Sequence, residues 1–64
     1  MKFSIPNMTC GGCVRGVTAT IQDLDPQATV SADLSNKTIE VTSILEANHI
    51  QQALKADDFP ATLV

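Results

Sequence analysis

The apolar residues of this chain change their spacing along the sequence, and the order of these changes limits the folds available to it. Phe3 and Ile5 alternate with polar neighbours, as in a short strand, and Pro6 follows. Between residues 14 and 24 the spacing becomes helical, with an apolar stripe formed by Val14, Val17, Ile21 and Leu24. Because Pro26 cannot continue a helix, we expect this one to end near Asp25. The residues expected off the stripe, toward solvent, are Arg15, Thr18, Gln22 and Asp25.

Strand-like alternation returns after Pro26 and gives way to a second helical pattern. The apolar residues expected to point inward from residues 28–34 and 38–42 are Ala28, Val30, Ala32, Leu34, Ile39 and Val41. A turn signal at Ser35-Asn36 joins the two runs into a predicted hairpin. Residues 43–46 match a capping box, in which Ser43 and Glu46 cap the start of a helix. This helix is expected to end around Ala56 and to bury Ile50, Ala53 and Leu54.

Residues 61–64 form a short apolar tail that is expected to be an edge strand. The order strand, helix, strand, strand, helix, strand is a split βαβ pair, which predicts an α+β ferredoxin-like fold. Right-handed crossovers place both helices on one face of a four-stranded antiparallel sheet and leave the other face partly exposed to solvent. With 64 residues, the chain is short for even one domain, so we expect residues 1–64 to be a single domain.

Charge and composition exclude several classes of function. Seven acidic residues against four basic ones give a net charge of −3, which disfavours nucleic acid as a partner. No apolar run approaches the roughly 18 residues of a membrane span, and residues 1–7 lack the features of a signal peptide. We therefore expect a cytoplasmic protein that does not insert into a membrane. In that reducing compartment, a cysteine pair more often binds a metal or performs redox chemistry than forms a structural bridge.

Both cysteines of the chain lie in residues 8–13, Met-Thr-Cys-Gly-Gly-Cys, between the first strand and the first helix. Gly11 and Gly12 are expected to give the backbone the freedom to bring the two sulfurs together. Cys13 is expected in the first helical turn and Cys10 just before it, where unpaired N–H groups and the helix dipole favour thiolates. Two thiolates select Cu(I) or a similarly soft ion.

A structural zinc site would need four ligands, and His49 is the only further candidate of the usual zinc type. Its neighbour Ile50 is expected on the buried face of the second helix, so His49 is expected to face solvent. A two-ligand site on a loop is open, and a thiol of another protein can enter it before one of the original sulfurs leaves. We therefore expect the metal to be exchangeable.

The same six residues resemble the MxCxxC motif of the heavy-metal-associated domains, and the resemblance extends over essentially the whole chain. These domains occur as small copper chaperones and at the N-termini of copper-transporting P-type ATPases. The resemblance implies that Cys10 and Cys13 bind Cu(I) and deliver it to such an ATPase by thiol exchange. It also implies that Met8 is a buried anchor of the loop and not a ligand. Thr9, Gly11 and Gly12 would then surround the ligands.

Two further residues are candidates for the surroundings of the metal. Phe59 matches a loop position that is variably aromatic, Lys or His in the family, although an ordinary core phenylalanine is an equal alternative. Arg15 either offsets the negative charge of a bis-thiolate complex or is a solvated helix residue. The chain departs from the family pattern at Asp58, where glycine is usual, and at Pro60 and Pro26. Residues 59–62, Phe-Pro-Ala-Thr, are also similar to mercury-binding relatives.

Three alternatives to copper delivery remain open at this level. The motif also fits a thiol-disulfide oxidoreductase, but the chain is shorter than a thioredoxin-like fold and has no Trp, so we expect no enzyme. It also fits a detached regulatory or storage domain for the same metal. The third alternative is a carrier or sensor domain for Hg(II), Zn(II) or Cd(II). Thr9 is neutral where some divalent-metal relatives carry an acidic residue, which favours Cu(I). The protein is expected to be a monomer, with a metal-bridged homodimer as the alternative.

Overall fold

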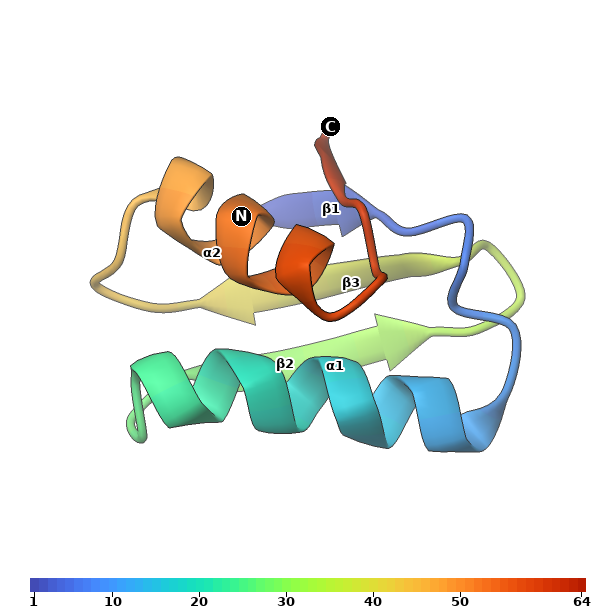
Figure 1. The fold of residues 1–64 in the computed structure, drawn as a ribbon, viewed down its shortest axis with the longest axis horizontal. Helices are drawn as coiled ribbons and strands as arrows, with labels where there is room; N and C mark the ends of the chain where they lie inside the picture. Colours follow the sequence, from blue (N-terminus) through green and yellow to red (C-terminus); the bar gives the residue numbers. More distant parts are fainter.

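The computed structural model describes residues 1–64 and contains four strands and two helices. In chain order they are β1 (Lys2–Ser4), α1 (Gly11–Leu24), β2 (Thr29–Asp33), β3 (Thr38–Thr42), α2 (Ala47–Ala56) and β4 (Thr62–Leu63). The strands form one antiparallel sheet in the order β2-β3-β1-β4 (Figure 1). This βαββαβ arrangement confirms the predicted ferredoxin-like fold.

The register of the sheet follows from the alternation in the sequence. Phe3 on β1 lies opposite Ile39 on β3 and Leu63 on β4, so these three side chains share the face that carries the helices. On the neighbouring pair, Val30 of β2 lies opposite Val41 of β3. A shift of one residue would turn every one of these side chains to the other face, which is why the register is well specified.

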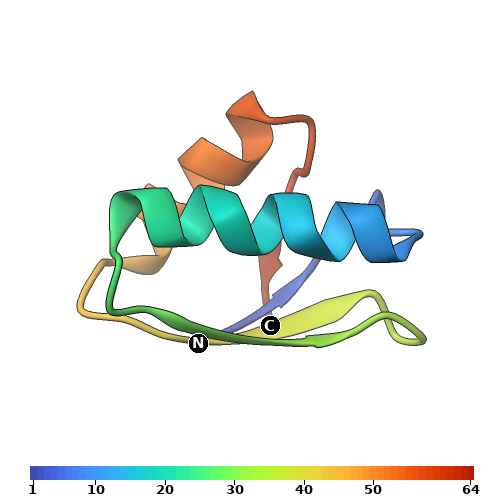
Figure 2. The ribbon, with the colours of Figure 1, turned by 90° about the horizontal axis from the view of Figure 1, so that it is seen from below.

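Both helices cover the same face of the sheet, with α1 and α2 side by side above it (Figure 2). The core between the layers consists of Phe3, Ile5, Met8, Val17, Ile21, Ala28, Ile39, Val41, Ile50 and Leu54. Lys2 and Glu40 lie on the opposite face and are exposed, as the alternation predicted. Neither helix has the length and hydropathy needed to span a bilayer.

The end of α1 differs from the prediction at two residues. Leu24 was expected inside but is 44% exposed, because the helix stops there and the chain turns back toward the sheet. Asp25 was expected in solvent but is only 6% exposed. Its carboxylate accepts hydrogen bonds from the Gln27 N–H at 3.0 Å and from the Ser43 hydroxyl at 2.8 Å. These bonds compensate the cost of burying the charge.

The predicted capping box is wrong. The second helix begins at Ala47, and Glu46 is the residue before it, with no side-chain capping bond. Ser43 does not cap this helix, because its hydroxyl donates to Asp25 and accepts from the Leu45 N–H at 3.0 Å. The loop before α2 is therefore tied to the end of α1.

The buried face of β2 is smaller than the sequence pattern suggested. Ala28 is buried and Val30 half-buried, whereas Ala32 is exposed and Leu34, 39% exposed, lies in the turn after the strand. These side chains are more exposed than expected because β2 lies at the edge of the sheet and has a neighbouring strand on one side only. On α2, Ala53 is half-buried, while Ile50 and Leu54 are fully buried as expected.

Three connections meet at one end of the molecule, which we call the cysteine end: residues 5–10 between β1 and α1, residues 34–37 between β2 and β3, and residues 57–61 between α2 and β4. Figure 2 shows the start of α1 and the loop before it, in blue, between the green-yellow hairpin turn and the orange α2–β4 loop. Cys10 ends the first of these connections, and Phe59 lies on the third.

Candidate metal centre

Cys10 and Cys13 lie where the sequence placed them relative to α1. Cys10 is the residue immediately before the helix and has extended backbone, with φ −151° and ψ 168°. Its carbonyl accepts the N–H groups of Cys13 at 3.0 Å and Val14 at 3.2 Å, which closes the first turn. This turn brings the two Sγ atoms to 3.0 Å from each other. Both thiols are free.

The two sulfurs differ in their surroundings. Cys10 is exposed, whereas Cys13 is half-buried and packs against the hydrophobic core. The pKa of Cys13 is lowered, first by the hydrogen bond with the Cys10 side chain and second by the backbone of Thr9, while desolvation opposes the shift. The start of α1 has no side-chain cap and no acidic residue in its first turn. Its unpaired N–H groups and the positive end of the dipole therefore remain available to a thiolate.

Gly11 and Gly12 have a different role from the one predicted. Neither has a positive φ, and both lie in the first turn of α1, so the backbone does not require glycine there. A Cβ on Gly11 would have no heavy atom within 4 Å, and one on Gly12 would lie 3.8 Å from Cys10 Sγ. A side chain at position 12 would therefore lie beside the Cys10 sulfur, whereas one at position 11 would extend into open space.

Met8 is completely buried and belongs to the core cluster. Its N–H donates to the Ile5 carbonyl at 3.0 Å, which turns the chain between β1 and the cysteines. The burial expected from the resemblance is therefore present. Only Thr9 separates this buried anchor from the exposed thiol of Cys10, so the loop passes from the core to the surface within two residues.

Phe59 packs against α1 and is half-buried beside the core. Its ring carbons Cε2 and Cζ lie 3.6 and 3.9 Å from the position that a Cβ on Gly16 would occupy. Gly16 is one turn beyond Cys13, so the ring covers α1 directly behind the thiols. Phe59 is therefore a packing residue, as one alternative expected, and a role beside the metal stays a prediction.

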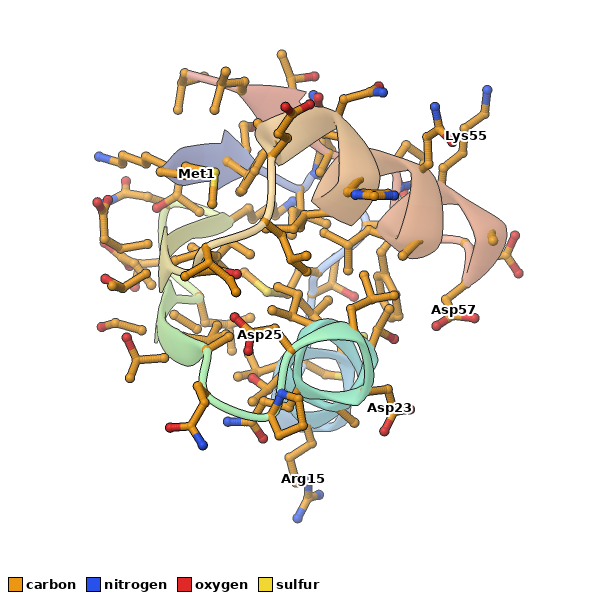
Figure 3. All side chains as sticks on the ribbon, turned by 90° about the vertical axis from the view of Figure 1, so that its left-hand side faces the viewer. Met1, Arg15, Asp23, Asp25, Lys55 and Asp57 are labelled. Carbon is orange, nitrogen blue, oxygen red and sulfur yellow. The ribbon has the colours of Figure 1, made fainter.

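The other predicted neighbours are exposed. Thr9 precedes Cys10 and contributes through its backbone to the lowered pKa of Cys13. Arg15 extends from α1 away from the body of the molecule (Figure 3) and makes no ion pair. His49 lies on the exposed side of α2. No group of three or more His, Cys, Asp or Glu side chains gathers anywhere in the structure to hold a metal ion.

One contact at the cysteine end was missed by sequence reasoning. The Asn7 side chain donates through Nδ2 to the Asp58 carbonyl at 3.0 Å, and so joins the loop before Cys10 to the loop that carries Phe59. Asp58 has φ 67° and follows α2, where its N–H bonds the Lys55 carbonyl. The missing glycine at this position was a signal of unusual backbone, but nothing local to Asn7 indicates a partner 51 residues away.

This arrangement offers two soft sulfur ligands at an exposed helix start, with no third protein ligand beside them. Thiolates of this kind bind soft metal ions, and the site is open to a further ligand from another molecule. The βαββαβ fold and the exposed cysteine pair together define a class of small metal-binding domains. The heavy-metal-associated domain model matches residues 2–57, and the chain belongs to that family.

Several solved structures share the fold over nearly the whole chain. A gold-binding protein is 43% identical, with a TM-score of 0.93 over 95% of this chain and 94% of that one. The copper chaperone Atx1 from Synechocystis PCC6803, in a trimeric form, is 29% identical, with a TM-score of 0.94 over 97% and 98%. A structure concerned with crosstalk between Cu(I) and Zn(II) homeostasis is 31% identical, with a TM-score of 0.92 over 97% and 98%. No curated protein matches the chain in sequence.

Proposed function

We propose that this protein is a cytoplasmic copper chaperone that binds one Cu(I) ion through the thiolates of Cys10 and Cys13. The observation that carries the proposal is the pair of free sulfurs 3.0 Å apart at the uncapped start of α1. Thiolates favour Cu(I) over hard cations, and the absence of further protein ligands keeps the ion exchangeable. The receiving partner is the metal-binding domain of a copper-transporting P-type ATPase, which the family resemblance implies.

The distance between the two sulfurs is expected to change as the ion binds and as it is transferred. With a metal–sulfur distance of about 2.3 Å, two ligands in a line lie about 4.6 Å apart and three trigonal ligands about 4.0 Å apart. The sulfurs therefore separate when the ion enters and draw closer again when a partner's thiol becomes the third ligand. Cys10 is the exposed sulfur, and Gly11 and Gly12 place no side chain in the path of its rotation.

Gold is the second candidate cargo. The gold-binding protein shares 43% of its residues with this chain, whereas the copper chaperone Atx1 shares 29%. Au(I) is a soft monovalent ion like Cu(I), and the same two thiolates suit it. We therefore propose Au(I) as the alternative ion, ahead of Hg(II), Zn(II) and Cd(II).

Anaerobic titration of the reduced protein against a competing chelator tests the choice of ion. We expect one Cu(I) per chain, with binding lost in Cys10→Ser and in Cys13→Ser, and weaker binding of Zn(II). A parallel titration with Au(I) decides between the two monovalent ions. Stoichiometric Zn(II) binding that outcompetes both would contradict the proposal.

Delivery is tested by mixing the metal-loaded protein with an apo acceptor domain that carries two thiols. Transfer faster than release of the ion to a chelator supports stepwise thiol exchange, and transfer no faster than release contradicts it. The protein is expected to be monomeric without metal, and any metal-bridged dimer should disappear in Cys10→Ser. Catalytic turnover in an insulin-reduction assay would instead favour an oxidoreductase.

A further inference from the structure

The end of α2 is closed by hydrogen bonds that fix the three residues after the helix as one unit. The Phe59 N–H donates to the Leu54 carbonyl at 2.8 Å, and the Asp58 N–H donates to the Lys55 carbonyl at 3.1 Å. This pair of bonds is the Schellman motif, in which Asp58, with φ 67°, takes the left-handed position that glycine usually fills. Residues 57–59 therefore have a defined geometry, and we call them the α2 brace.

The α2 brace contacts α1, the helix that carries Cys13. The Thr20 hydroxyl donates to the Asp57 carboxylate, and Figure 3 shows Asp57 at the end of α2 on the side of α1. The Phe59 ring lies 3.6 Å from the position that a Cβ on Gly16 would occupy. Gly16 and Cys13 are three residues apart and are therefore neighbours on the helix surface. The brace is thus fastened to α1 within one turn of Cys13.

The same brace is bonded to the loop that carries Cys10. Asn7 donates through Nδ2 to the Asp58 carbonyl at 3.0 Å. Asn7 lies in a turn that is closed by the bond from the Met8 N–H to the Ile5 carbonyl, and Cys10 follows this turn by two residues. Burial of Met8 also holds the turn, but apolar packing has no preferred direction, whereas the hydrogen bond from Asn7 does. This bond therefore restrains the turn against shifting away from the brace.

We infer that Asn7 is a positioning residue for the metal centre, because its bond to the α2 brace limits how far the Cys10 loop moves away from α1. The two cysteines lie on the two segments that the brace joins, and their Sγ atoms are 3.0 Å apart. Two sulfurs in line on one ion lie about 4.6 Å apart, and two of three trigonal sulfurs lie about 4.0 Å apart. A restraint on the separation therefore opposes linear coordination more than trigonal coordination.

This inference rests on the proposed function, and it adds a reason why the ion is passed on. An ion held by two sulfurs that are restrained from separating gains more from a third sulfur than an ion in an unrestrained linear complex. When a thiol of the acceptor enters, its proton goes to solvent, one metal–sulfur bond forms, and the oxidation state of the ion stays the same. Asn7 touches neither the ion nor the sulfurs and acts only through the distance between them.

Asn7→Ala tests the inference, and Gln51→Ala is its matched control. Gln51 also donates a side-chain amide, through Nε2, to a carbonyl in the connection after α2, that of Ala61, at 3.0 Å. Each variant loses one such bond and should lose a similarly small part of its stability in urea. Only the bond from Asn7 reaches the Cys10 loop. Asn7→Ala should therefore bind Cu(I) about two- to ten-fold more tightly than the unmodified protein, which is the value of one hydrogen bond, and Gln51→Ala should not.

Anaerobic titration against a competing chelator measures these affinities, with and without β-mercaptoethanol as the source of a third sulfur. The gain in Asn7→Ala should become smaller with saturating β-mercaptoethanol, because trigonal coordination needs less separation of the two sulfurs. Asn7→Leu keeps a side chain of similar volume without the donor and should match Asn7→Ala. Unchanged or weaker binding in Asn7→Ala, or an equal gain in Gln51→Ala, overturns the inference.

The mobility of the loop without metal gives an independent measurement. Backbone amide relaxation by NMR should show greater mobility of Thr9 and Cys10 in Asn7→Ala than in the unmodified protein and in Gln51→Ala. Equal mobility in all three proteins overturns the inference. If the unmodified protein binds no Cu(I), the proposed function fails while this mobility still decides the role of Asn7. If all three proteins bind one Cu(I) with equal affinity, only the inference fails.

Discussion

Met8 offers a quantitative test of how the core holds the cysteine loop. Its side chain is completely buried, and truncation of a buried methionine to alanine costs about 2–5 kcal/mol. At about 0.05–0.15 kcal/mol per residue, the whole free energy of unfolding of a chain of this length is about 3–10 kcal/mol. Met8→Ala should therefore remove a large share of the stability. Met8→Leu conserves the volume and should cost less than about 1.5 kcal/mol.

Urea unfolding measures both effects, because the midpoint shifts by the change in free energy divided by the m-value. With an m-value of about 1 kcal/mol/M for a small domain, Met8→Ala should lower the midpoint by about 2 M or more. Met8→Leu should shift it by less than about 1.5 M.

Metal binding by the same two variants separates the anchoring role from a ligand role. Met8→Leu lacks the thioether sulfur but keeps the packing, so its affinity for Cu(I) should equal that of the unmodified protein. Met8→Ala should bind more weakly only in proportion to its unfolded fraction. A tenfold loss of affinity in a stably folded Met8→Leu protein would refute the argument, since it would make the sulfur a ligand.

The remaining predictions concern α1, the buried carboxylate and the lone histidine. Gly16→Ala should raise the free energy of unfolding by roughly 0.5–1 kcal/mol in urea, because glycine is unfavourable within a helix and a Cβ there would make only ordinary contact with the Phe59 ring. Asp25 has a lowered pKa, first because the Ser43 hydroxyl donates to it, so its contribution to stability is complete above the unfolded-state pKa of about 4 and is lost as the pH falls through the folded-state value. Asp25→Asn should accordingly be less stable than the unmodified protein at pH 6, and the difference should narrow toward pH 2; a constant difference would contradict this. His49→Ala should leave Cu(I) affinity unchanged in the chelator titration, whereas a weaker complex would make His49 a ligand.

The fold was predictable because the two periodicities of the sequence are local. The stripe at Val17 and Ile21 and the alternation at Ile39 and Val41 each depend only on near neighbours, and all four residues are buried. The capping box failed because the Ser43 hydroxyl bonds Asp25, which is 18 residues earlier in the chain. No local pattern contains that partner.

Like the fold, the candidate site has features that depend on near neighbours in the sequence and features that depend on distant ones. The closeness of the Cys10 and Cys13 sulfurs was predictable because their spacing and their place at a helix start are local properties, and the two sulfurs lie 3.0 Å apart. The contact of Phe59 with α1 and the bond from Asn7 to Asp58 depend on how the two halves of the chain pack together. Their sequence separation explains why the local motif did not reveal them.

Some residues depart from the usual sequence preferences for helix caps, buried charges and left-handed backbone. The two ends of the molecule differ in how these departures are compensated. At the end away from the cysteines, the buried Asp25 carboxylate and the Ser43 hydroxyl satisfy each other and nearby N–H groups, so the missed cap is compensated by hydrogen bonds. At the cysteine end, Lys37 and Asp58 keep left-handed backbone, and α1 starts without a side-chain cap. Glycine at either position or a carboxylate in the first turn of α1 would relieve these costs, and the cysteine end keeps them beside the two thiols. Departures of this kind from local sequence preferences gather at functional sites.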